Sequence, residues 1–207
     1  MTDMKFLLIL GLLLTSIRAQ AKPVAPAFLI VPGQSIGKIK LGDDRETVRK
    51  KMGVPFKTSN EKLAAYEKSS DPKALNPYKK VKERDVVIDE WWRPKAVGRL
   101  KAIYDAGRVI QIQVSLSGYA TEYGLAPNSP MKQVEKRYRS PRIVEFGFGS
   151  NDFFNETFAL VQTQDYVAEG LAVLTGLYDE GSRPWGIYTI FVHERNRLVF
   201  TGSSGLN

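Results

Sequence analysis

The stretch DEWWRP, from Asp89 to Pro94, combines residue types that act on sugars with residue types that bind proteins. A glycosidase places two carboxyl groups about 5–10 Å apart, one on each side of the bond that it cleaves. Neighbouring residues of a strand point to opposite faces, so Asp89 and Glu90 cannot both serve one cleft. Glu90 acting with a distant carboxylate keeps a glycan hydrolase open as one alternative.

The same alternation separates the two tryptophans of this stretch. We expect one in the core and the other half-exposed, where its ring can stack on a sugar or on a partner's side chain. Other aromatic residues fall in or near the expected loops and strand ends, where an exposed subset would form a binding surface. The candidate partner-binding residues are Trp91, Trp92, Trp185, Tyr119, Phe148 and Phe153.

The composition excludes several kinds of catalytic centre. The sequence has no cysteine, which excludes disulfides, a thiol nucleophile and cysteine-bound metal. The one histidine, His193, excludes a metal site built from several histidines. It ends an apolar run, so we expect a strand-end residue near the surface rather than a catalytic base. No glycine-rich phosphate loop is present, and we expect no catalytic residue, no metal and no cofactor.

Basic residues offer a second way to bind. Lys and Arg number 30 against 22 Asp and Glu, which gives a net charge of +8. An exported basic protein meets anionic lipid and polysaccharide, so a surface for such envelope material is an alternative function, although the same residues could form solvated faces. Nucleic acid is not an expected partner, because no nucleic-acid motif occurs. The candidate anion-binding residues are Arg49, Lys50, Lys79, Lys80, Lys82, Lys136 and Arg137.

Positions 1–21 have the pattern of a secretory signal peptide. Lys5 precedes an apolar run from Phe6 to Leu14, and Ala19 and Ala21 form a small-x-small cleavage site. The run is shorter than the about 20 residues that a membrane helix needs. We expect cleavage after Ala21, a linker over 22–32, no transmembrane segment in the mature chain, and export to the periplasm or the medium. Without a cysteine, no lipid anchor is expected.

One eight-residue phrase occurs twice, as VRKKMGVP at 48–55 and as VEKRYRSP at 134–141. A helix-capping residue stands five positions before each copy, Asp43 before the first and Ser129 before the second. Gly53 can end the first helix, and Pro130 suits the first position of the second. The sequence therefore predicts a short helix at each place.

A second phrase is also doubled, as YDAG at 104–107 and YDEG at 178–181. Asp-x-Gly between two alternating apolar runs predicts a hairpin turn. Strands are predicted near 85–92, 97–105, 108–117, 142–148, 157–163, 170–178 and 186–193, and an edge strand can follow at 196–201. The polar stretch near 60–84 is rich in lysine and broken by two prolines, which predicts a surface insertion with at most one short helix.

Helix and hairpin recur in the same order, which predicts a tandem repeat. The predicted fold class is α+β, with module 1 at 33–120, which carries the polar insertion, and module 2 at 121–207. Each module is expected to pack one capped helix on a three- to four-stranded antiparallel sheet.

The stretch VPGQSIGKIKLGDDRETVRKKMGVP resembles the entry motif of the small exported domains of the outer-membrane-assembly lipoprotein (SmpA/OmlA) type. It also resembles the β-lactamase inhibitor protein type, which is built from two helix-plus-sheet modules. The resemblance implies a non-catalytic, exported protein that binds another protein, here across its sheet face. The anchoring cysteine of the lipoproteins and the disulfides of the inhibitors are absent from this chain, and no contact residue is carried over.

Overall fold

The computed structural model describes residues 24–68, 78–92, 98–151, 156–177 and 186–201, and these residues are mostly β. The predicted signal peptide, the second hairpin turn, Phe153 and Trp185 lie outside the described residues. A short 3₁₀ turn (Pro26–Phe28) leads into a small sheet with the strand order β3-β2-β1-β8. Its strands are β1 (Leu29–Val31), β2 (Ser35–Ile36), β3 (Ile39–Lys40) and β8 (Ala120–Thr121). Part of the expected 22–32 linker is thus strand β1.

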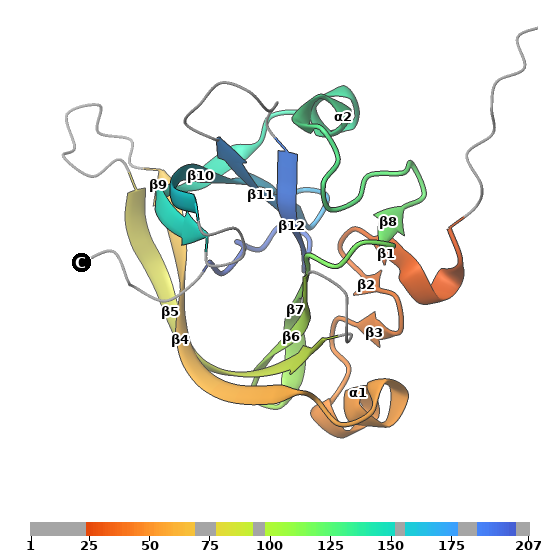
Figure 1. Ribbon diagram of the computed structural model, residues 1–207. Coiled ribbons are helices and arrows are strands. Elements are labelled where there is room, and N and C mark those ends of the chain that lie inside the picture. Colours follow the sequence, from red (N-terminus) through yellow and green to blue (C-terminus); the bar gives the residue numbers. More distant parts are fainter. Residues whose placement is uncertain (1–23, 69–77, 93–97, 152–155, 178–185, 202–207) are drawn as a thin grey trace, which may run out of the picture.

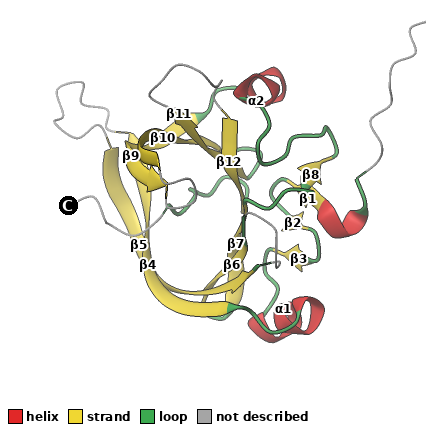
Figure 2. Cartoon of the chain, in the orientation of Figure 1, coloured by secondary structure: helices red, strands yellow, loops and turns green. Residues whose placement is uncertain are grey.

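Eight longer strands form one antiparallel sheet that curls round on itself (Figure 1). Its order is β4-β5-β6-β7-β12-β11-β10-β9, and its two end strands, β4 and β9, lie close to each other. The curl gives the sheet a concave face and a convex face (Figure 2). The strands are β4 (Lys57–Lys68), β5 (Tyr78–Trp91), β6 (Leu100–Asp105), β7 (Arg108–Val114), β9 (Arg142–Asn151), β10 (Glu156–Tyr166), β11 (Leu171–Leu177) and β12 (Gly186–His193).

The prediction of an α+β fold made of two tandem modules is wrong. Strands β7 and β12 are hydrogen-bonded neighbours, with Val114 opposite Ile190, so the two halves of the chain share one sheet. One apolar core also spans both halves, since it contains Val48 and Ile112 as well as Val134 and Ile190. Two separate four-stranded sheets would each expose edge strands, and the pairing of β7 with β12 removes one edge from each half.

The polar stretch near 60–84 is not a surface insertion either. The parts of it that the structure describes belong to β4 and β5, which pair over their whole described length. Leu63, Ala64 and Ala65 are buried, whereas many of their neighbours are charged and exposed. The lysines and glutamates of this hairpin therefore reflect exposed strand surface rather than a loop.

Two short helices pack against the convex side of the sheet: α1 (Arg45–Met52) and α2 (Met131–Arg137). Both begin one residue later than expected. Asp44, not Asp43, caps α1 by accepting from the Thr47 N–H at 2.8 Å, and Gly53 ends it at a φ of +84°. Pro130, not Ser129, stands at the N-cap of α2 and offers no side-chain bond. No described helix is long and apolar enough to cross a membrane.

The convex face is covered by the two helices and the small sheet. Ile30, Ile36 and Ile39 of the small sheet are almost completely buried against the sheet residues Ile112 and Val114. Backbone bonds fix this layer, because the N–H of Val109 donates to Asp43 and that of Gly42 donates to Val109. Burial of this apolar surface is the main source of stability for the layer.

The concave face is crossed by residues 197–201, which follow β12 and which we call the C-terminal strap. Gln111 of β7 holds the strap from two sides, since its amide donates to the Phe200 carbonyl at 2.7 Å and accepts from the Phe200 N–H at 2.8 Å. Phe200 then packs beside Leu63, Val86 and Ile103 on the concave face. Two other strap N–H groups also have acceptors on the sheet: Val199 N–H donates to Asp165 Oδ2 at 3.1 Å, and Thr201 N–H donates to the Ala64 carbonyl at 3.0 Å.

Two glycines join the small sheet to the large one. Gly33 donates its N–H to the carbonyl of Gly170 at 3.0 Å, and the His193 N–H donates to that same carbonyl at 3.0 Å. Gly170 has a φ of +70°, a conformation that favours glycine. A Cβ at this position would lie 2.4 Å from the His193 carbonyl oxygen and 2.6 Å from Gly33 Cα. Only glycine lets the two backbones approach so closely.

Gly170→Ala is expected to destabilise the protein much more than Gly107→Ala. Gly107 also has a positive φ, +76°, but a Cβ there would meet nothing within 4 Å. We expect a loss of about 1 kcal/mol in the free energy of unfolding for Gly107→Ala, from backbone strain alone, and at least about 3 kcal/mol for Gly170→Ala. Urea unfolding of both variants measures this, and equal losses would contradict a close-packed glycine junction.

Candidate functional site

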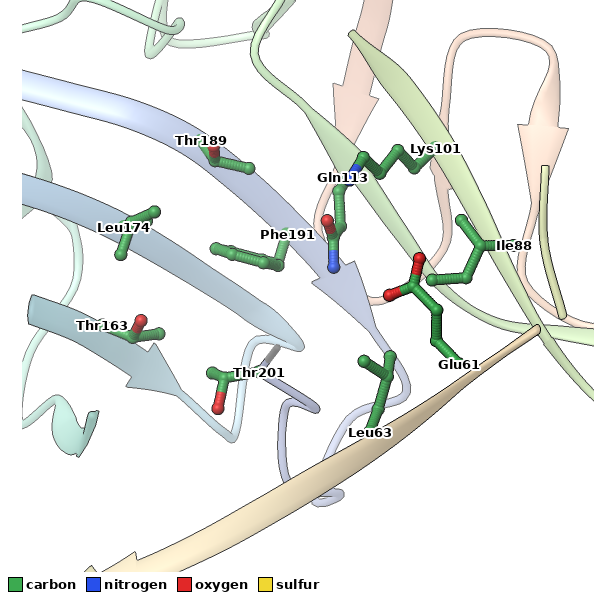
Figure 3. Close-up of a pocket in the computed structure, with 10 residues that line it drawn as sticks. All are labelled: Glu61, Leu63, Ile88, Lys101, Gln113, Thr163, Leu174, Thr189, Phe191 and Thr201. Atoms are coloured by element: carbon green, nitrogen blue, oxygen red, sulfur yellow. The ribbon is translucent and has the colours of Figure 1, made fainter. Parts of the chain in front are cut away.

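Three adjoining hollows run along the concave face towards its rim. The largest of the three, which we call the concave cavity, has a volume of about 270 Å³ and is drawn in Figure 3. A second hollow, of about 160 Å³, shares Lys101, Gln113 and Thr189 with it and adds Arg99 and Ser115. The concave cavity is lined by Glu61, Leu63, Ile88, Lys101, Gln113, Thr163, Leu174, Thr189, Phe191 and Thr201.

The third hollow lies at the rim, where β5 ends and β6 begins. It has a volume of about 260 Å³ and is lined by Phe56, Glu90, Trp92, Gly98 and Arg99. Arg99 also lines the second hollow, so the series is continuous from the cavity to the rim. The concave face therefore offers a connected series of hollows with both polar and apolar lining residues.

Asp89 and Glu90 point to opposite faces of β5, as the alternation of the strand predicts. Asp89 is fully buried on the convex side, where it joins α1 to the sheet. Arg49 Nε and Arg45 Nη2 each donate to its carboxylate at 2.8 Å, and the hydroxyl of Thr58 donates at 2.7 Å. Burial alone would raise the pKa of Asp89, but these hydrogen bonds hold it well below its usual range. Asp89 is a structural ion-pair residue.

Glu90 lies on the concave side, where its carboxylate forms ion pairs with two basic side chains. Its Oε1 is 3.0 Å from Arg99 Nη1, and its Oε2 is 3.6 Å from Lys101 Nζ. The carboxylate that lines the neighbouring cavity is Glu61, which stands opposite Val86, four residues along β5 from Glu90. At about 3.3 Å per residue this places the two backbones roughly 13 Å apart along the strands. Both carboxylate oxygens of Glu90 are engaged in ion pairs.

The two tryptophans also separate. Trp91 is only 8% exposed, and its indole N–H donates to the Gly53 carbonyl at 3.1 Å. Trp92 is 49% exposed and packs edge to face with Phe56, at 5.0 Å between ring centroids. Phe56 is 68% exposed and Val54 is 90% exposed. We call Val54, Phe56 and Trp92 the apolar rim.

The remaining aromatic candidates do not join this rim. Tyr119 is buried beside Phe28 in the convex core. Phe148 belongs to β9, and its side chain lies outside the described part of the structure. The sequence did not single out Phe56, although its position directly after Gly-Val-Pro, at the end of a capped helix, is a signal of exposure.

The basic candidates are spread over three separate places. Lys50 and Arg49 lie on α1, with Arg49 already bound to Asp89. Lys136 and Arg137 lie on α2, where Arg137 stacks over the Tyr123 ring at 3.6 Å. The two helices stand at opposite ends of the molecule (Figure 1). The other three candidates lie on β5: Lys79 and Lys82, which are exposed, and Lys80, which pairs with Glu83 at 2.8 Å.

His193 is not near the surface, so that prediction is wrong. It is 1% exposed, and its Nε2 lies 2.9 Å from Asp165 Oδ1 while its Nδ1 lies 3.0 Å from the Glu194 carbonyl oxygen. The other oxygen of Asp165 accepts from the strap at Val199. This pair holds the strap against β10 and β12. Sequence reasoning missed it because the strap returns to a strand about thirty residues away, and no local pattern reports that.

Within the described ranges, no group of three or more His, Cys, Asp or Glu side chains is placed to hold a metal ion. Searches of protein-family models, curated proteins and solved structures with this chain gave no match. The resemblance to the lipoprotein and inhibitor types therefore remains a prediction from the sequence.

Asp89→Asn is expected to loosen α1 from the sheet. The substitution leaves two guanidinium groups without their carboxylate, and both side chains are about one-third exposed, 32% and 39%. We expect a loss of about 2–3 kcal/mol in the free energy of unfolding at pH 7, less than for a fully buried pair because water screens the arginines.

The pH dependence of that loss tests its cause. Because the pKa of Asp89 is lowered on folding, its contribution is complete above the ordinary carboxyl pKa of about 4 and disappears as the pH falls towards the folded pKa. The difference between wild type and Asp89→Asn in urea unfolding should thus shrink between about pH 5 and pH 2.5. A difference that stays constant over this range would contradict the ion-pair explanation.

Proposed function

We propose that this chain is an exported, non-catalytic binding protein that captures a segment of another protein at its apolar rim. The observation that carries the proposal is the exposure of Phe56 and Trp92, 68% and 49%, above a hollow of about 260 Å³. Export is supported by the signal-peptide pattern of residues 1–21.

The rim has the chemistry of a protein-binding hot spot. Exposed aromatic rings beside a hollow are unfavourable in water and are enriched at the centres of interfaces. The edge-to-face contact of Phe56 with Trp92, at 71° between the ring planes, orders both rings before a partner arrives. Less side-chain freedom is then lost on binding, which favours affinity.

Charge indicates which kind of segment fits. Arg99 lines the hollow and is 44% exposed at its side chain, and it shares the single carboxylate of Glu90 with Lys101. The ion-pair group beside the hollow thus contains two cations and the carboxylate of Glu90. A segment with an apolar or aromatic side chain beside an acidic one would complement both features.

The anion-binding alternative has less support. Its residues lie on α1, α2 and the start of β5, and these elements are far apart in the fold (Figure 1). Binding of polysaccharide or lipid by charge alone needs a continuous basic surface and weakens as salt rises. Salt therefore separates this alternative from capture at the rim.

Removal of the two rim rings is expected to abolish most of the binding. The double variant Phe56→Ala with Trp92→Ala should retain at least tenfold less partner from the envelope and medium of the producing cell, because hot-spot aromatic residues commonly contribute about 2 kcal/mol or more. The rings are exposed, so the fold should persist. The measurement is a pull-down at low and high salt, with retained proteins quantified by mass spectrometry.

Tyr123→Ala is the matched control, because Tyr123 is an exposed aromatic residue, 56% exposed, on another part of the surface. A protein retained at high salt by wild type and by Tyr123→Ala, but not by the rim variant, is the expected result. Equal retention by the rim variant would sink the proposal, and retention of salt-labile glycan or lipid alone would replace it with the anion-binding alternative.

A further inference from the structure

Strand β4 is an end strand of the large sheet, and its first half has no neighbour on the outer side among the described residues. β5 pairs with one side of β4 over its whole described length, and the strand order places nothing beyond β4. Figure 1 shows β9 near the far end of β4, whereas the beginning of β4 runs beside α1. An exposed edge of this kind presents backbone N–H and C=O groups that can pair with another chain.

The direction of the backbone groups shows which residues of this edge are open. The N–H of Thr201 donates to the Ala64 carbonyl at 3.0 Å in an antiparallel bridge, so Ala64 points its backbone groups away from β5. Successive residues of a strand point these groups to opposite sides. The register of β4 with β5 is unbroken over residues 57–65, so every second residue before Ala64 also points outwards. These residues are Thr58, Asn60 and Lys62.

We call Thr58, Asn60 and Lys62 the open edge. All three are exposed, and within the described part of the chain their backbone makes no hydrogen bond on the outer side. A hollow of about 400 Å³ adjoins this stretch and is lined by Asn60, Glu61, Lys62, Asp85, Val86 and Val87. When a peptide adds to a sheet as a further strand, main-chain bonds give affinity and such hollows receive its alternate side chains.

The open edge continues directly from the apolar rim. Phe56 stands two residues before Thr58, about 7 Å away at the rise of a strand. The N–H of Phe56 donates to the Glu90 carbonyl at 2.8 Å, which keeps this residue in line with β4. A segment held at the rim by an apolar side chain can therefore extend along β4. Lys57 is exposed where the rim and the edge meet, and it offers a cation to an acidic side chain of the segment.

A second copy of this chain does not fit the open edge. The antiparallel register that pairs all three outward residues of two copies sets Asn60 opposite Asn60 and Thr58 opposite Lys62. The same register sets Phe56 of each copy opposite Ala64 of the other, a position that Thr201 already occupies. A short segment of a different protein can end before Ala64 and so avoid this collision.

We propose that the partner captured at the apolar rim adds an extended segment to β4 as a further strand, paired with Thr58–Lys62. The segment carries an aromatic or large apolar side chain that packs on the rim and an acidic side chain beside Lys57. This inference rests on the proposed function, because the rim selects the partner, and it adds how the partner's backbone is held. The outward N–H and C=O groups of the open edge bond to that backbone.

The test uses a defined peptide as the probe. The peptide is the tightest binder selected at high salt from a phage-displayed library of linear peptides on the full-length protein. Each of its residues is N-methylated in turn, and the affinities are measured by calorimetry. Alternate N–H groups of an added strand face β4, so N-methylation should weaken binding about fivefold at every second position and little in between. Effects without this period of two would overturn the proposal.

Asn60→Pro is expected to block the pairing from the side of the protein. Proline removes the outward N–H of residue 60 and places its ring where the segment would lie, while Ser59 and Glu61 keep their bonds to β5. Peptide binding should weaken at least about tenfold, because several main-chain bonds are lost together. Asn60→Ala is the matched control, since it keeps the N–H, and it should bind normally.

Ser59→Pro checks the direction of the backbone groups. The N–H of Ser59 faces Ile88 of β5, so its removal breaks the ladder inside the sheet. In urea, Ser59→Pro should unfold at a clearly lower concentration than Asn60→Pro, and Asn60→Pro should resemble Asn60→Ala. Equal destabilisation by the two prolines would contradict the assignment of the open edge.

The rim variant, Phe56→Ala with Trp92→Ala, separates this inference from the proposed function. Loss of peptide binding in both the rim variant and Asn60→Pro is the expected result. A peptide that needs the rim but binds Asn60→Pro normally would overturn the added strand and leave capture at the rim standing. A peptide indifferent to both variants, or a library without a binder, would also overturn the added strand, and the pull-down at high salt would then decide capture at the rim by itself.

Discussion

The pairing of β7 with β12 is the interaction on which the rest of the structure depends. It places Val114 opposite Ile190 and so joins two groups of four consecutive strands into a single sheet. The resulting sheet of eight strands curls far enough to bring β4 near β9, which produces a concave interior. The convex core follows from the same pairing, since Ile112 and Ile190 then lie in one layer under both helices and the small sheet.

A curled sheet with apolar residues on both faces is stable only if both faces are shielded from water. The convex face is covered by separate elements, whereas the concave face is covered partly by its own side chains and partly by the strap. The strap does not pair with the sheet as a regular strand. Its backbone N–H groups instead donate to polar side chains of the sheet, Gln111 and Asp165. Burying these side chains is tolerated because each is hydrogen-bonded. The strap covers one end of the face, and the concave cavity is the part that it leaves open.

Local patterns predicted much of this fold. The alternation in RVIQIQV located β7, the capping residues located both helices to within one residue, and the separation of Asp89 from Glu90 followed from the strand period. The failures concern contacts between distant parts of the chain. Nothing local shows that β7 meets β12, and the composition of β4 resembles a loop because much of that strand is exposed.

The candidate site residues also divide into those that local sequence patterns predict and those that depend on distant contacts. Trp92 could be found from the sequence, because strand alternation implies that one of two adjacent tryptophans is exposed. Its partner Phe56 and the hollow below them needed the return of β5 beside the end of α1. The concave cavity carried no local signal, since its lining residues come from several strands and from the strap, which only the fold brings together. Sequence can indicate which side chains are available, but only the fold shows which of them meet.

Glu90 marks a boundary between the rim hollow and the concave cavity. Its carboxylate lies between Arg99, which lines the rim hollow, and Lys101, which lines the concave cavity. Each cation is attracted to that carboxylate, which limits the movement of its side chain. A substitution at Glu90 would therefore disturb both hollows together, so Glu90 cannot be used to test either hollow alone.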